Sequence, residues 1–331
     1  MTISILLERL GIDYPIIQAG MGGGTATPEL AAAVSRAGAL GSIGIEPVRR
    51  FAADLRRARS LAPGRPIAAN LLLPFASRAH VDACIAEKVA AVVLFFGFRR
   101  DFVARLRAAG VFVLHQVGTA DEARRALLDG ADALIAQGLE AGGHLLAVEP
   151  TAQVLPRLLA LSDGKPVLVA GGITGAQEVR AALAAGAAGV MAGSRFLLTK
   201  ESSAHPAYKQ RVLGAKRTLV TRLFGFAWPA RHRVVPNLAT EKWAPAGDEP
   251  AWVAALQRAT VILQKLPMSD GLARLAALQR LWLPLYTPVS PLRWMDERIC
   301  DVAPLYAGEG VKRIRRVVPA AEAVAELARG L

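Results

Sequence analysis

The stretch LLDGADALIAQGLEAGGH, residues 127–144, contains the pattern that decides the fold. A segment of helical length ends in Leu-Leu-Asp, Gly130 follows, and a short apolar run then leads into a glycine-rich turn. Glycine suits the left-handed conformation that closes many helices. A continuous apolar run indicates a strand buried on both faces of a parallel sheet. The stretch therefore predicts a helix, a strand and a loop at the carboxyl end of that strand.

The same phrase recurs three more times along the chain, in SRAGALGSIG (35–44), RAAGVFVLHQ (107–116) and LAAGAAGVMAGS (183–194). Eight βα units within about 200 residues fit an α/β protein with a (β/α)8 TIM barrel. A doubly wound open sheet is the alternative, and the lack of two obvious halves favours the barrel. The eight strands are expected at 15–19, 40–44, 66–73, 90–96, 111–117, 131–137, 166–172 and 188–193.

The regular alternation ends near residue 200. Residues 201–310 contain all five Trp, with the clearest helical segments at 251–265 and 269–283. Because this part follows the eighth strand, we expect it to form a mostly helical lid, or substrate subdomain, over the carboxyl ends of the strands. The ending PAAEAVAELARGL (319–331) has an amphipathic helical pattern that suits the eighth barrel helix. The barrel is therefore predicted to comprise residues 1–200 and 311–331.

Composition and charge argue against several classes of protein. The sequence has no run of about 18 apolar residues, so we expect no membrane span, and charged residues near the N-terminus argue against a signal peptide. Cys84 and Cys300 stand alone, which predicts a cytoplasmic protein without a disulfide framework or a metal site. The net charge of +13 is spread along helices without interleaved aromatic residues, so no nucleic-acid partner is expected.

Two glycine-rich turns follow the last two expected strands. Backbone N–H groups without side chains in the way, together with a helix N-terminus, form an anion site. In TIM barrels, phosphate sites often lie after strands seven and eight. The plainer interpretation is that these glycines only make tight βα turns, but their position favours a phosphate. The candidate residues are Gly171, Gly172, Ala192, Gly193 and Ser194.

A third glycine-rich turn, GMGGGT (20–25), follows the first expected strand. Residues without Cβ allow a flat ring to lie against the backbone. A flat cofactor with one phosphate is the joint interpretation of the three turns. Flavin mononucleotide (FMN) fits better than a dinucleotide, because GMGGGT is not followed by the acidic residue that binds a ribose.

His144 is the candidate catalytic residue. A neutral imidazole near pH 7 accepts or donates a proton at a substrate atom, although a structural histidine that caps the loop is an equal alternative. Glu140 is expected to anchor the same loop by hydrogen bonds. His115 also follows a strand, but a role in the core is favoured. Structural roles are expected for the remaining histidines, His80, His205 and His232.

Together these motifs resemble the nitronate monooxygenase family (formerly 2-nitropropane dioxygenases) and the related FMN-dependent enoyl-acyl-carrier-protein reductase II group. The resemblance extends from about residue 14 to 208 and weakens through the lid, and AQGLEAGGH (136–144) is its most specific element. The matching pieces are PIIQAGMGGGTATPELAAAVSRAGALGSIG, GADALIAQGLEAGGH, PVLVAGGI, GVMAGSRFLLTKES and AHPAYK, with a looser match at PLYAGEGV.

The resemblance implies an enzyme, an FMN-dependent oxidoreductase that acts on a small molecule. Nitronate monooxygenases oxidise alkyl nitronates with oxygen to a carbonyl compound and nitrite, and this is the favoured activity. The alternative is an NAD(P)H-dependent reductase of enoyl thioesters or quinones. NAD(P)H therefore stays open as an electron donor, and so does a homodimer. A flavin- or acyl-binding protein without turnover is a third hypothesis, which the presence of His144 and both glycine turns disfavours.

The resemblance also assigns residue roles. Gly20, Met21 and Gly22 would line the isoalloxazine ring, and Asn70 and Gln137 would donate or accept hydrogen bonds at its edge. His144 falls on the family's active-site histidine. The ribityl phosphate would be held by Gly142, Gly172, Gly193 and Ser194.

Three segments depart from the family pattern: VLFFGFRRD (93–101) at the fourth expected strand, VFVLHQVGT (111–119) at the fifth, and the lid segment TRLFGFAWPARHRVVPN (221–237). These positions are expected to shape the substrate pocket. The identity of the substrate therefore stays open at this level, whereas the expectation of a flavin does not depend on these segments.

Overall fold

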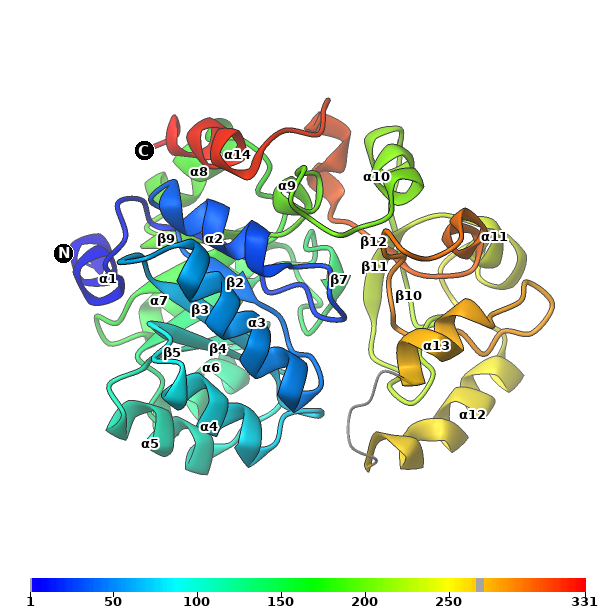
Figure 1. Cartoon of the computed structure of the whole chain (residues 1–331), viewed down its shortest axis with the longest axis horizontal. Coiled ribbons are helices and arrows are strands. Elements are labelled where there is room, and N and C mark those ends of the chain that lie inside the picture. The colour runs from blue at the N-terminus through cyan, green and yellow to red at the C-terminus, as the bar shows by residue number, and fades with distance from the viewer. Residues whose placement is uncertain (1, 266–270) are drawn as a thin grey trace.

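The fold is a closed parallel barrel, described for residues 2–265 and 271–331 by a computed structural model (Figure 1). Gln18 N donates to Leu40 O and Leu40 N donates to Ile16 O, so the outer strands β1 and β2 join and close the sheet. The predicted (β/α)8 TIM barrel is therefore confirmed. In sheet order the strands are β1 (Ile16–Gln18), β9 (Gly189–Ala192), β8 (Val167–Ala170), β6 (Ala133–Gln137), β5 (Phe112–Val117), β4 (Ala91–Phe95), β3 (Ile67–Leu72) and β2 (Gly41–Ile43).

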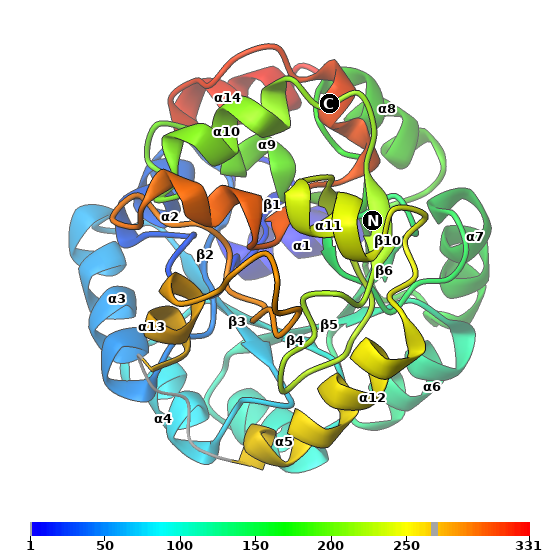
Figure 2. The same cartoon turned by 90° about the vertical axis from the view of Figure 1, so that its right-hand side faces the viewer.

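An outer layer of helices surrounds these strands (Figure 2). The last of them, α14 (Ala320–Ala328), packs against α2 and α8, so the C-terminal segment closes the ring as predicted. The other helices of the layer are α2 (Pro28–Arg36), α3 (Val48–Leu61), α4 (Arg78–Ala86), α5 (Arg100–Ala108), α6 (Ala120–Leu128), α7 (Thr151–Leu161) and α8 (Ala176–Ala184).

The recurring glycine phrase has the predicted geometry. Gly38, Gly110, Gly130 and Gly186 follow helix ends with φ angles of +92°, +78°, +99° and +96°. These angles lie in the left-handed region that favours glycine, which explains why each helix stops before the next strand. The predicted N-cap also forms, because the side chain of Thr27 accepts a hydrogen bond from Leu30 N at the start of α2.

Alternate side chains of each strand point to opposite sides of the barrel wall. Leu114 and Ile135 pack inside the barrel with Leu6 of helix α1 (Thr2–Leu10), which the sequence did not predict and which contributes to the interior cluster. Val113 and Leu134, one residue earlier on the same strands, pack outward against the helices. This alternation decides which residue near each strand end can reach the interior.

Residues 201–265 and 271–310 lie over one end of the barrel (Figures 1 and 2). The expected helix at 251–265 consists of α12 (Ala251–Ala259) and a 3-10 helix, η1 (Thr260–Lys265). The expected helix at 269–283 is the shorter α13 (Gly271–Ala277), and its predicted start lies outside the described residues. The other elements of this segment are α10 (Pro206–Leu213), α11 (Leu238–Trp243), η2 (Glu297–Asp301) and η3 (Glu309–Arg313), and the short helix α9 (Ser194–Leu197) precedes it.

A small antiparallel sheet within the lid was not expected from the sequence. It comprises β10 (Leu219–Thr221), β11 (His232–Val235) and β12 (Leu305–Tyr306), and β11 also pairs with β7 (Gly143–His144). These strands contain only two to four residues each, which is too short for a periodic pattern to stand out. The pairing of β7 with β11 attaches the loop after β6 directly to the lid.

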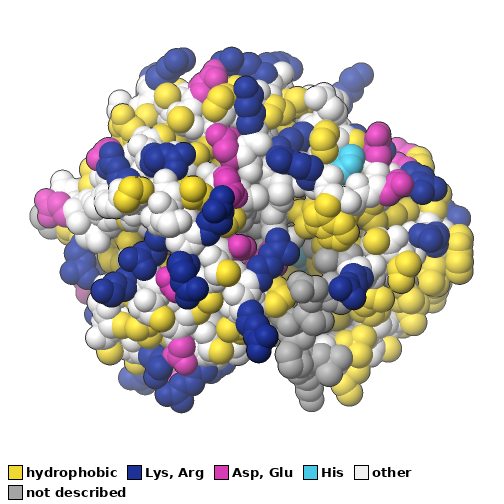
Figure 3. Space-filling view, viewed as in Figure 1, with side chains coloured by type: hydrophobic (Ala, Val, Ile, Leu, Met, Phe, Trp, Pro, Cys, Tyr) yellow, Lys and Arg dark blue, Asp and Glu magenta, His cyan; other side chains and the backbone are white. Residues whose placement is uncertain are grey.

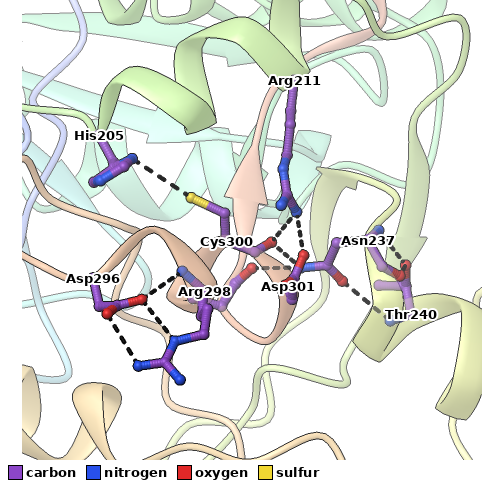
Figure 4. A network of polar contacts seen from close by, with 9 residues as sticks. His205, Arg211, Asn237, Thr240, Asp296, Arg298, Cys300 and Asp301 are labelled. Carbon is purple, nitrogen blue, oxygen red and sulfur yellow. Dashed lines mark hydrogen bonds and ion pairs between the residues drawn. The ribbon is translucent and has the colours of Figure 1, made fainter.

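A buried polar network holds the end of the lid together (Figure 4). The amide of Asn237 donates to Cys300 O at 3.0 Å and to Ala303 O at 2.8 Å, and its oxygen accepts from Thr240 N at the start of α11. Arg211 of α10 donates to the same carbonyl of Cys300 at 2.9 Å. Helices α10 and α11 are therefore both tied to the segment around η2.

Candidate active site

A cavity of about 280 Å³ lies between the carboxyl ends of the barrel strands and the lid. From the lid side, Tyr208, Trp228 and Tyr306 line it. In the described part of the chain, no Asp, Glu, Lys or Arg side chain lines this cavity. The predicted site residues that line it are Gly20, Met21, Gly22, Asn70, Gln137, Gly142, His144, Gly171, Gly172, Gly193 and Ser194.

Ala192 is the one predicted site residue that does not line the cavity. Its side chain is 1% exposed and packs with Val190 and Ile16 in the outer layer. Met191, its neighbour on β9, points inward and lines the cavity. The alternation of side chains along the strand therefore turns Ala192 toward the helices.

The two turns after β8 and β9 meet at one end of the cavity. Gly171 and Gly172 have φ angles of +129° and +70°, which let the turn double back. Within the described residues, the N–H groups of Gly172 and Ile173 donate no hydrogen bond. The helix α9 begins at Ser194, after the second turn. Free backbone donors without side chains fit a bound phosphate.

The glycine turn after β1 packs closely against neighbouring backbone. A Cβ added at Gly20 would collide with Cβ of Asn70, so this glycine is already required by the approach of the β1 turn to β3. Asn70 is 5% exposed, and its amide makes no hydrogen bond within the described residues. An amide in that position is available to a ligand in the cavity.

Gln137 lines the cavity but has most of its hydrogen bonds within the protein. Its nitrogen donates to His144 O at 2.9 Å, and its oxygen accepts from Leu146 N at 2.8 Å. It therefore holds the loop that carries His144. Gln116 of β5 also lines the cavity, and its side chain has no hydrogen-bond partner in the described chain. No role was predicted for this residue from the sequence. Gln116 lies two residues after Leu114, whose side chain points into the barrel, and this spacing was the sequence signal that Gln116 also points inward.

His144 stands in an aromatic environment. Its ring stacks on Trp228 with centroids 4.0 Å apart at 25°, and the ring of Tyr306 lies 5.3 Å away. Burial, followed by the neighbouring His232, lowers the pKa of His144 well below 6.5. The imidazole is therefore neutral at physiological pH, and a neutral imidazole can accept a proton.

The other predicted roles in this region are structural. The carboxylate of Glu140 accepts hydrogen bonds from the backbone and the hydroxyl of Thr151 at 3.0 and 2.8 Å, which confirms it as a loop anchor. His115 points outward, donates to Gly97 O at 3.0 Å and stacks on Phe98, and it does not line the cavity.

His232, for which a structural role was predicted, lies beside His144. It is fully buried, pairs with His144 across β7 and β11, and its ring centroid lies 5.4 Å from that of His144. Sequence reasoning missed it because the two histidines belong to distant segments that only the lid sheet brings together. The unusual segment 221–237 was the one signal in this direction.

Fold and site together define a class. A TIM barrel with glycine-rich strand-end turns, free backbone donors and a neutral histidine in a cavity is typical of phosphate-bearing cofactor enzymes. The family model for nitronate monooxygenase matches residues 4–81 and 74–330. The chain belongs to the nitronate monooxygenase family and is an oxidoreductase.

Individual relatives agree with this assignment. The chain is 33% identical over 288 residues to the (3aS,4S,5R,7aS)-5-hydroxy-7a-methyl-1-oxo-octahydro-1H-indene-4-carboxyl-CoA dehydrogenase of Rhodococcus jostii, covering 84% of this chain and 80% of that protein. It is 38% identical over 263 residues to a nitronate monooxygenase of Pseudomonas aeruginosa, covering 64% and 74%. The solved structure of nitroalkane oxidase from Streptomyces ansochromogenes has a TM-score of 0.75 and 26% identity, with 98% of each chain covered.

Proposed function

We propose that this protein binds FMN and oxidises nitroalkanes and their nitronates, with His144 as the base that removes the α-proton of a neutral nitroalkane. The observation that carries the proposal is the position of His144, which stacks on Trp228 in a cavity lined by no charged side chain of the described residues. An unprotonated imidazole at the wall of the cavity can act as general base toward a substrate carbon acid that lies within hydrogen-bond reach.

The residues present fit FMN. The free N–H groups of Gly172 and Ile173 suit its phosphate, and the unpaired amide of Asn70 suits a polar ring edge. Gly193 lies in the neighbouring turn after β9, where an added Cβ would make only an ordinary contact, 3.7 Å from Cβ of Ala19. When bound, FMN supplies an acceptor for electrons from the substrate carbon and a route to oxygen.

The protein side of the reaction is proton transfer and exclusion of water. His144 would take the α-proton, and Trp228 holds the imidazole ring by stacking on it. Tyr208 and Tyr306, both from the lid, close the cavity beside His144. Their hydroxyl groups donate to Tyr306 O at 2.7 Å and Pro288 O at 3.1 Å, so they are already paired within the protein.

The test compares two forms of one substrate. The purified protein is first assayed for released FMN, and the absorbance of the bound flavin is then followed without oxygen after addition of nitroethane or of preformed ethyl nitronate. We expect His144→Gln to slow the response to nitroethane by about 10²- to 10⁴-fold, the usual contribution of a general base. The response to the nitronate should persist, because that substrate has already lost its proton.

Equal losses with both substrates would assign His144 a role other than proton removal. A protein that takes up no FMN would contradict the cofactor proposal. Trp228→Phe is a useful companion variant, because it retains an aromatic face beside His144 and should retain most of the response.

A second candidate is oxidation or reduction of an acyl thioester. The Rhodococcus jostii relative, which covers 84% of this chain, is named as a carboxyl-CoA dehydrogenase, and a neutral thioester also has an acidic α-proton. In this case nitroethane would leave the flavin absorbance unchanged, whereas an acyl-CoA, or NADPH followed by an enoyl thioester, would alter it. The same anaerobic titration therefore separates the two candidates.

A further inference from the structure

The buried side of the His144 ring faces a second histidine, His232. Nε2 of His144 and Nε2 of His232 are both buried, and neither has a hydrogen-bond partner in the described residues. Leaving a buried polar atom unpaired destabilises the folded protein, because the atom loses its hydrogen bonds to water. Two such atoms on adjacent rings therefore call for an explanation.

The tautomer of His232 follows from its contact with the backbone. Nδ1 of His232 lies 3.0 Å from Ala230 O, and a carbonyl oxygen can only accept. Nδ1 must therefore carry the proton. In the neutral ring this leaves Nε2 of His232 as a bare acceptor inside the protein.

The placement of the two rings is set by the backbone. His144 and His232 are direct partners in the antiparallel pairing of β7 with β11, and Leu145 N donates to Arg231 O at 2.8 Å beside them. Gln137 fixes the same loop through His144 O. The ring centroids are 5.4 Å apart and the ring planes are inclined at 70°, so the two imidazoles are in edge contact, and a hydrogen bond between their Nε2 atoms requires the side chains to turn toward each other.

We propose that His144 carries its proton on Nε2 and donates it to Nε2 of His232, so that His232 is a positioning residue that leaves Nδ1 of His144 unprotonated toward the cavity. This arrangement pairs both buried nitrogens with each other. The opposite tautomer of His144 would leave two buried acceptors side by side with no donor. Nδ1 of His144 is not among the buried unpaired atoms and makes no hydrogen bond with the described residues, so it is the nitrogen left for substrate.

The consequence for turnover rests on the proposed function, but the tautomer itself does not. The chain has only five histidines, so ring ¹⁵N signals of histidine-labelled protein can be resolved and assigned with single variants. Long-range ¹H–¹⁵N spectra at pH 7, recorded on the protein as purified, distinguish a protonated from an unprotonated ring nitrogen. We expect His144 to be protonated at Nε2 and His232 at Nδ1.

Two variants separate positioning from simple packing. His232→Phe retains an aromatic ring but removes the acceptor, and it should populate the Nδ1-protonated form of His144. His232→Gln retains an amide oxygen that can accept, and it should restore the Nε2-protonated form. His205→Gln is the control, because His205 caps α10 through Ala207 N and should leave the His144 signals unchanged.

Enzyme activity provides a second measurement on the same variants. With nitroethane, or with a thioester if that is the substrate, His232→Phe should lower kcat/KM by about 10- to 100-fold with KM little changed, since a misplaced tautomer disables a base without removing binding. His232→Gln should recover most of the loss. Protonation of Nδ1 of His144 in the unmodified protein, or identical His144 signals in His232→Phe, would overturn the proposal, whatever the substrate proves to be.

Discussion

At the scale of single residues, two glycines that line the cavity, Gly20 and Gly193, differ in why the position is glycine. Gly20 is required because the β1 turn approaches Asn70, irrespective of any ligand. Gly193 is different: its φ of −106° suits any residue, and the nearest atom to an added Cβ is 3.7 Å away. Nothing in the protein itself demands glycine at this position, which makes a bound ligand the simplest reason for it.

Gly193→Ala therefore tests the phosphate site directly. We expect the free energy of unfolding to change by less than about 0.5 kcal/mol, because the methyl group makes only an ordinary van der Waals contact, 3.7 Å from Cβ of Ala19. The dissociation constant for FMN, measured by flavin fluorescence, should rise by about 10-fold or more, equivalent to about 1.4 kcal/mol.

The matched control is Gly214→Ala. Gly214 follows α10 with φ of −81°, and an added Cβ there would lie 3.5 Å from the nearest atom, away from the cavity. It should alter neither stability nor FMN affinity. An unchanged affinity in Gly193→Ala would remove this turn from the cofactor site.

At the scale of elements, the lid sheet holds the histidine loop in place. Arg233 of β11 is 5% exposed, and its guanidinium donates twice to Leu139 O, at 3.1 and 2.8 Å. It also donates to the hydroxyl of Thr218 at 3.1 Å and pairs with Glu309 at 3.0 Å. One side chain thus connects β11 to the turn after β6 and to η3.

Arg233→Met should loosen that connection while retaining an apolar stem. Since it removes both hydrogen bonds to the partly buried carbonyl of Leu139 and the ion pair with Glu309, we expect the free energy of unfolding in urea to fall by about 2–3 kcal/mol. Arg231→Met is the control, because the Arg231 side chain makes no hydrogen bond or ion pair with described residues. A loss of similar size in both variants would show that general charge, rather than the Leu139 contact, stabilises the lid.

At the scale of the whole molecule, charge is dispersed rather than concentrated. Figure 3 shows Lys and Arg scattered over the visible face with Asp and Glu among them. This agrees with the expectation of no nucleic-acid partner, which stays a prediction. No helix within residues 2–265 and 271–331 is long and apolar enough to cross a membrane.

The division into two units also stays a proposal. We propose a barrel of residues 1–200 and 311–331 and a lid of residues 201–310, supported by a lid cluster that includes Tyr208, Val234 and Tyr286. The same cluster contains Leu198 and Val311, so the two units share apolar surface at their boundary. The cavity lies where the two units meet.

Buried histidines make the stability of the whole fold sensitive to acid. Burial lowers the pKa of both His115 and His232 to about 4, against 6.5 in the unfolded chain. Between pH 6.5 and 4 the unfolded chain binds more protons than the folded one, so the free energy of unfolding falls as the pH falls. Each histidine contributes up to about 3 kcal/mol to this loss.

His115→Gln isolates one of these contributions. Glutamine can still donate to Gly97 O but does not titrate, so urea unfolding at pH 7 and pH 4.5 should show a pH-dependent loss smaller by about 2 kcal/mol than in the unmodified protein. His115 lies outside the cavity, so FMN binding should not change. An equal loss in both proteins would contradict a neutral, buried His115.

The sequence by itself determined the barrel, the order of its elements and the glycine-rich part of the cavity lining with His144. Strands, helix caps and turns depend on contacts between near neighbours, so continuous apolar runs and glycines such as Gly130 reveal them. Only the tertiary structure decided that Ala192 faces the helices, that Gln137 is bonded to its own loop and that His232 lies against His144. The reason is physical: alternation along a strand separates its two faces, but packing across the barrel and lid decides which face lies inside and which distant strands pair.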